Sequence, residues 1–258
     1  MRVTVDYWDA GGFIPKPHQE EIESIFELTL SKRVGRKLGY DQRSGPNITI
    51  SIFPDTNLVN GWCLDASLLG MNDICITVNP HRPSYLYMDG AEVLSGLTSL
   101  HLYEALRNAK MGKDKTLSRA IITRGLALNF LAETHHPVFY EYPLVTSWQL
   151  GGVGEQVAAL SEAKDPEKIL KYICGSELPE HYDLYPPNAG NLLAFVFMKK
   201  WLGENRKRSS EVVGFKATAA LRQLSRATDL KAIFEEIVRS TAPSALMPNT
   251  LASDVPDV

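Results

Sequence analysis

The hydrophobic periodicity of the chain changes near residue 85, and this change limits the folds open to it. Residues 2–8 and 47–55 alternate apolar and polar side chains, which is the pattern of half-buried strands. Residues 70–83 contain a turn, a short β-branched run and a proline stop, which again predicts a strand. The first third of the chain is therefore expected to contain a small sheet.

Helical spacing dominates the remainder. Residues 18–34 are predicted to form an amphipathic helix, because Ile22, Ile25, Phe26 and Leu28 keep helical spacing and acidic residues occupy the first turns. After residue 85, helices are expected at 90–110, 116–134, 153–163, 165–174, 188–203, 209–224 and 229–239. The predicted fold class is α+β, with a small N-terminal β-sheet part that includes a helix, followed by a mainly helical C-terminal half.

We expect one domain over residues 1–240, with a sheet part at 1–88 and a helical part at 89–240 that enclose a central cleft. Residues 241–258 are rich in proline and poor in charge pairs, so they are expected to form a C-terminal tail.

Composition excludes several functional classes. The chain has 258 residues, 44% of them hydrophobic and 22% charged, and a formal net charge of −3, which argues against nucleic-acid binding. The N-terminal residues resemble a strand more than an export signal, and no apolar run is long enough to span a membrane. Cys63, Cys75 and Cys174 are widely spaced, as in a reduced protein. We therefore expect a cytoplasmic protein without a membrane or nucleic-acid partner.

One helix, "LTSLHLYEALRNAK" at residues 97–110, has part of the pattern of a zinc-peptidase helix. In an HExxH helix, two histidines four residues apart share a face and bind one zinc ion, and the glutamate after the first histidine takes a proton from the bound water. Here His101 occupies the first position, Leu102 the glutamate position and Ala105 the second histidine position.

The chain resembles the predicted zinc-dependent proteases of otherwise unknown function that have a zincin-like fold, in which HExxH is followed by an EGLAxxF helix. The resembling stretches are "ITISIFPD" with the following strand "NDICITVNP", "LHLYEALRNAK", "IITRGLALNFLAE" (121–133) and "YPPNAGNLLAFVFMKKWL" (185–202). They follow the family's order over roughly residues 47–224. The resemblance implies a zincin-like fold with a degenerate metal site.

The metal site is degenerate because Arg124 stands where the family has the glutamate of its second helix, so a fixed positive charge replaces a ligand. We therefore expect no metal and no cofactor. One alternative stays open: "HLYEA" is also a truncated form of the inverted motif HxxEH, and Glu133, His135 and His136 would then be further ligands.

The charged residues that remain suggest another chemistry. His101, Glu104 and Arg107 follow one another at intervals of three, and zincin-like packing would place Arg124 opposite them with Tyr103 at the side. One interpretation is a structural ion pair between Arg124 and Glu104. The other is a repurposed site in which Glu104 and His101 transfer protons and Arg124 binds an anionic group.

Tyr103 and Arg107 are predicted to bind substrate together with Arg124, and so are three further residues. Trp62, in a loop before a cleft-lining strand, is expected at the rim, and His181 and Tyr185 are expected in the loop before the last resembling helix. His81, Arg82 and Tyr87 are weaker candidates in the loop after a strand.

The sequence thus predicts a metal-independent acid/base enzyme of lyase, cyclase or isomerase type that acts on a small or peptide-like ligand with an anionic group. The alternative is a catalytically inactive pseudo-peptidase that binds a ligand or a protein.

Overall fold

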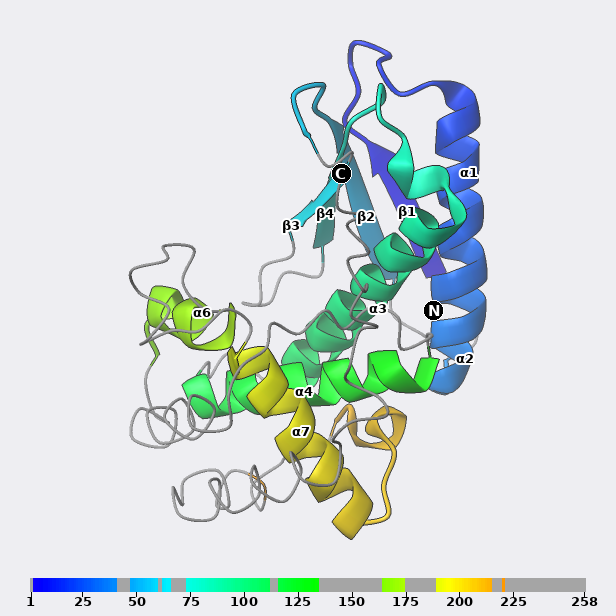
Figure 1. Ribbon diagram of the computed structural model, residues 1–258. Coiled ribbons are helices and arrows are strands. Elements are labelled where there is room, and N and C mark those ends of the chain that lie inside the picture. Colours follow the sequence, from blue (N-terminus) through cyan, green and yellow to red (C-terminus); the bar gives the residue numbers. More distant parts are fainter. Residues whose placement is uncertain are drawn as a thin grey trace, which may run out of the picture.

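The computed structural model describes residues 2–40, 47–59, 62–65, 73–111, 116–134, 164–174, 189–214 and 220. In these residues a small β-sheet lies at one end of the molecule and a group of helices lies at the other (Figure 1). The fold is mixed helix and strand, of α+β type, as the sequence predicted.

The sheet has four strands in the order β1 (Arg2–Tyr7), β2 (Asn47–Pro54), β4 (Asp73–Val78) and β3 (Trp62–Asp65). The first three are parallel, with Ile50 opposite both Val5 and Ile74, and β3 pairs antiparallel to β4 at the edge. The strands predicted at 2–8, at 47–55 and within 70–83 are confirmed. The residues of β3 were expected in a loop, and this expectation was wrong, because β3 is a short edge strand.

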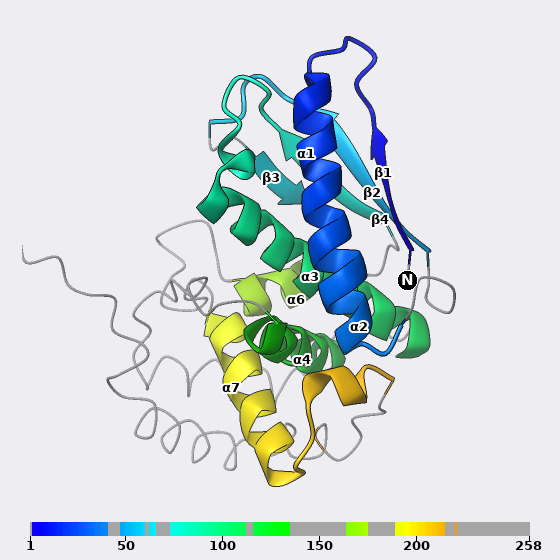
Figure 2. The same cartoon turned by 90° about the vertical axis from the view of Figure 1, so that its right-hand side faces the viewer.

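One face of the sheet belongs to the hydrophobic core. Ile48, Ile50 and Ile52 are buried, whereas Thr49 and Ser51 between them are not, so the predicted alternation holds in β2. The helical rod that begins with α1 (Lys16–Phe26) runs along the sheet, and α3 (Met88–Met111) lies on the side of β3 and β4 (Figure 2).

The rod is longer than predicted and changes its winding. After α1 it continues as a π-helix at Glu27–Val34 and a last α-turn, α2, at Gly35–Lys37. The buried residues Ile22, Phe26, Leu30 and Val34 recur every four residues. An α-helix with 3.6 residues per turn rotates such a row steadily away from the core, and the wider π-helical turn counteracts this rotation. Leu28 was expected on the apolar face but is exposed.

The helical part is built on α3, α4 (Leu117–Thr134) and α7 (Ala189–Glu204), with the shorter α6 (Pro166–Cys174) beside α7. Residues Ile121 to Leu131 of α4 are all buried, so this helix is the centre of the helical part. Two 3-10 helices complete the described elements, at Ser84–Leu86 and Ser209–Val212.

Four predicted helices correspond to α3, α4, α6 and α7. The helix predicted at 209–224 was wrong at its start, because residues 209–212 form a 3-10 turn. The helices predicted at 153–163 and 229–239 and the tail at 241–258 lie outside the described residues. In the part of the chain that the structure describes, no helix is both long and apolar enough to cross a membrane.

Candidate functional site

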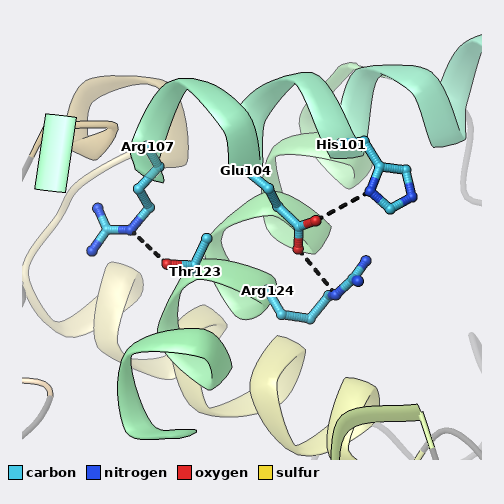
Figure 3. A network of polar contacts seen from close by, with 5 residues as sticks. All are labelled: His101, Glu104, Arg107, Thr123 and Arg124. Carbon is cyan, nitrogen blue, oxygen red and sulfur yellow. Dashed lines mark hydrogen bonds and ion pairs between the residues drawn. The ribbon is translucent and has the colours of Figure 1, made fainter. Parts of the chain in front are cut away.

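Three of the predicted site residues meet where α3 crosses α4. Glu104 lies between the other two, with Oε2 3.2 Å from His101 Nδ1 and Oε1 3.0 Å from Arg124 Nε (Figure 3). We call His101, Glu104 and Arg124 the charged cluster. Its geometry follows from the spacing of three residues between His101 and Glu104 on α3 and from the packing of α4 across that helix.

The charged cluster is deeply buried. The side chain of Glu104 is 3% exposed, that of Arg124 9% and that of His101 14%. Among the described residues, both carboxylate oxygens of Glu104 and the Nε atom of Arg124 nevertheless lack a hydrogen-bond partner with acceptable geometry. The two distances are therefore those of close ion pairs whose angles are poor for hydrogen bonding. A buried carboxylate with unused acceptor capacity is unusual, because buried polar groups are normally hydrogen-bonded.

The surrounding helices leave the cluster little freedom. Leu102 and Leu106 are buried beside it on α3. A Cβ atom on Gly125, the neighbour of Arg124, would lie 2.1 Å from the carbonyl oxygen of Ala194, so α4 touches the backbone of α7 there. One turn on, Asn129 donates hydrogen bonds to the carbonyl oxygens of Gly125 and Phe195, at 2.7 and 2.9 Å. Arg124 thus extends from a helix that is fixed on the α7 side.

Arg107 and Tyr103 were expected to join the cluster, and the structure corrects this expectation. Arg107 extends away from Glu104 and donates to Thr123 Oγ1 at 3.3 Å and to the carbonyl oxygen of Val212 at 3.0 Å (Figure 3). The hydroxyl of Tyr103 donates to the carbonyl oxygen of Ser209 at 2.6 Å. Burial lowers the pKa of Arg107 and raises that of Tyr103. Both residues fasten the segment at 209–213 to α3.

Glu133, a possible ligand in the inverted-motif alternative, has a similar structural role. Its Oε1 atom accepts hydrogen bonds from the backbone N–H of Ser209 at 2.9 Å and from the Ser209 hydroxyl at 2.5 Å. It lies nine residues beyond Arg124, which is about 13 Å along the helix axis. His135 and His136 are outside the described residues. Within the described ranges, no three His, Cys, Asp or Glu side chains are grouped as metal ligands.

In the described residues, none of the remaining candidates is seen in contact with the charged cluster. Trp62 lies in β3, opposite Val78, and His181 and Tyr185 lie outside the described residues. His81, Arg82 and Tyr87 are exposed in the loop after β4. Tyr87 precedes His101 by fourteen residues, roughly 20 Å of helix.

Cys174, the last residue of α6, lies near the cluster and was not predicted there. The residue is exposed as a whole, yet its sulfur is sufficiently covered that burial raises the pKa of the thiol. Arg124 lowers this pKa and Glu104 raises it, so both charges act on the sulfur. No motif in the sequence indicates this proximity, because it depends on how α6 lies against the other helices.

The comparisons with known proteins return no match: no family model, no curated protein and no solved structure is similar to this chain.

Proposed function

We propose that this chain is a metal-independent acid/base enzyme built on a zincin-like scaffold whose metal site has degenerated. The observation that carries the proposal is Glu104, a carboxylate that is 3% exposed and lies between a histidine and an arginine. Within the part of the chain that the structure describes, neither of its oxygens has a well-aligned hydrogen bond. Unused hydrogen-bonding capacity next to a fixed positive charge is suited to a polar ligand.

The order of the elements supports the scaffold part of this proposal. A small sheet is followed by two central helices, and these helices cross at the positions where the zinc proteases that the chain resembles carry their ligands.

Arg124 supports the metal-independent part. Its guanidinium is permanently charged and has its Nε atom 3.0 Å from the carboxylate that a metal ion would need. A dication at this place would be repelled by the guanidinium, so Arg124 acts as the positive charge that stabilises Glu104.

The proposed chemistry divides the roles within the cluster. Nδ1 of His101 faces Glu104, which leaves Nε2 as the ring nitrogen for a substrate. His101, the more exposed partner, exchanges a proton with the substrate, and Glu104 takes or returns a second proton. Arg124 has donors beyond Nε that suit a carboxylate, and it holds the anionic end of a small or peptide-like molecule. An acid/base pair beside an anion-binding group fits reactions of lyase, cyclase or isomerase type.

The test uses small carboxylates as probes: N-acetylated amino acids, dipeptides and lactam carboxylates. We expect some of them to raise the melting temperature of the wild type, and R124A to weaken their binding at least about tenfold. Products formed from the bound probes are detected by mass spectrometry. H101N and E104Q should keep binding and lose conversion. The control is R33A, which removes an exposed arginine from the π-helix. Unchanged binding and conversion in both R124A and E104Q would refute the proposal.

The alternative function is a pseudoenzyme that binds a ligand or a protein, with Arg124–Glu104 as a structural ion pair. It is favoured by the burial of both partners. If it holds, R124A should bind the probes as the wild type does and should unfold about 3–5 kcal/mol more easily, because Glu104 is then buried and uncompensated. Urea denaturation of R124A, E104Q and the double variant distinguishes the two functions.

A further inference from the structure

The large exposed apolar side chains are concentrated at one edge of the molecule. In the described residues there are five, and four of them lie in the three loops that follow the parallel strands: Trp8 (64% exposed), Phe13 (57%), Val59 (73%) and Tyr87 (68%). The fifth, Leu28, is on the π-helix. We call residues 8–15, 55–59 and 79–87 the edge loops.

The edge loops lie together because β1, β2 and β4 are parallel, so their carboxyl ends meet at the same edge of the sheet. Both views show the three loops at the top of the molecule, on the far side of the sheet from α4 and α7 (Figures 1 and 2). The apolar side chains are therefore carried on separate loops along one edge, well away from the charged cluster.

Hydrogen bonds hold the edge loops in shape without covering these side chains. Asp9 accepts from the backbone N–H groups of Phe13 and Ile14, at 2.8 and 2.6 Å. Asn79 donates to the carbonyl oxygens of Thr56 and Leu58, at 3.0 and 2.9 Å. The exposed aromatic residues are thus presented by ordered loops, so their insertion into a partner requires little additional ordering of the backbone.

In and beside the edge loops, the cationic side chains are more exposed than the carboxylates. The two carboxylates, Asp9 and Asp55, are only partly exposed, and each accepts a hydrogen bond from a backbone N–H in its own loop. Arg82 is exposed and donates to the carbonyl oxygen of Val59, and Lys16 is exposed where the first loop enters α1. The edge therefore offers cations to a partner and directs its carboxylates toward its own backbone.

We propose that the edge loops insert into an anionic lipid surface, as a peripheral contact separate from the charged cluster. Tryptophan, tyrosine and phenylalanine are the side chains that partition best into the interface of a bilayer, and nearby cations add attraction to anionic headgroups. Apolar side chains spread over three loops at the end of a molecule suit a flat surface better than the central pocket of a protein partner. The expectation of no membrane contact considered only spanning segments, which this mode of binding does not use.

The experiment measures sedimentation of the full chain with vesicles of phosphatidylcholine, with and without phosphatidylserine. The chain should sediment with the anionic vesicles, and W8S/F13S should bind at least about tenfold more weakly. K16A/R82A should lose binding mainly at low salt, where electrostatic attraction is strongest. Brominated lipids should quench the tryptophan fluorescence of the wild type more than that of W8S/F13S, which lacks Trp8 among the four tryptophans of the chain.

The matched control is L28S, which removes an equally exposed apolar side chain from outside the edge loops and should bind vesicles as the wild type does. The proposal is wrong if no vesicle composition binds the chain, or if L28S and W8S/F13S lose binding equally. Sedimentation velocity tests whether the edge loops bind a second copy of the chain instead. A wild-type dimer that becomes a monomer in W8S/F13S would show self-association and overturn the lipid proposal.

Discussion

Two buried tyrosines differ in the fate of their hydroxyl groups. Tyr103 donates to the carbonyl oxygen of Ser209, whereas the fully buried hydroxyl of Tyr85 has no hydrogen-bond partner among the residues that the structure describes. An unsatisfied buried polar group costs about 1–3 kcal/mol. We expect Y85F to raise the free energy of unfolding by about 1 kcal/mol and Y103F to lower it by a similar amount. Urea denaturation of both variants tests the contrast; equal destabilisation would show that Tyr85 has a partner.

The same pair predicts a dependence on pH. Burial raises the pKa of Tyr85 from 10.0 to about 12. The unfolded chain therefore releases this proton at lower pH than the folded chain, so the contribution is constant below pH 10 and stability falls as the pH rises from 10 toward 12. The free energy of unfolding of Y85F should decline less steeply over this interval. Identical slopes for Y85F and the wild type would assign the loss to other groups.

At the residue scale, the spacing of three correctly predicted that His101 lies beside Glu104, but it did not hold for Arg107. His101 and Glu104 are three residues apart, within about 60° on the helix surface, and the structure places them 3.2 Å apart. Arg107 is a further 60° away and faces Thr123 instead. The nearness of Cys174 depends on tertiary packing alone, which no local pattern encodes.

At the scale of elements, the contact between α4 and α7 depends on a residue without a side chain. A Cβ atom at Gly125 would overlap the backbone of Ala194, whereas one at Gly203, also helical, would meet nothing within 4 Å. We expect G125A to lower the free energy of unfolding by about 1–3 kcal/mol through overpacking. G203A should raise it by about 0.5–1 kcal/mol, since alanine favours the helix. Thermal or urea unfolding checks both, and a neutral G125A would show that α7 can shift outward at little cost.

The elements with strong periodicity were predicted well, because hydrophobic spacing alone indicates them. This is true of β2, whose alternation is regular, and of α4, which is a long apolar helix. The strand β3 was missed because its four residues are too few to show a period, and it forms by pairing with β4. The π-helix was missed because its row of residues four apart also fits an α-helix over a short range.

At the scale of the whole molecule, α3 joins the two parts. It begins beside the sheet and carries His101 and Glu104 to the crossing with α4, so the position of the cluster depends on both parts (Figure 1). The zincin-like assignment and the cleft stay predictions, since they concern relationships that extend beyond the described residues.

The metal content of the whole protein is the most direct test of the degenerate site. Protein purified without chelators should contain much less than one zinc per chain by elemental analysis, because Arg124 occupies the side of Glu104 that a metal would need. H101A should give the same content as the wild type. Stoichiometric zinc that is lost in H101A would overturn the metal-independent proposal and would favour a zinc-peptidase function.

The position of β1 at the edge of the parallel sheet also constrains how the chain folds during synthesis. Its partner β2 ends at Pro54, so β1 can pair only after the ribosome has synthesised the residues up to this proline. At typical rates of translation this delay is roughly 2–9 s, far longer than the microseconds in which a local helix forms. The rod α1 can therefore form while β1 is still unpaired, and the sheet is complete once β4 has followed. A nascent chain stalled before residue 73 would expose an apolar strand surface that chaperones bind, whereas one stalled after residue 78 and clear of the ribosome would hide it.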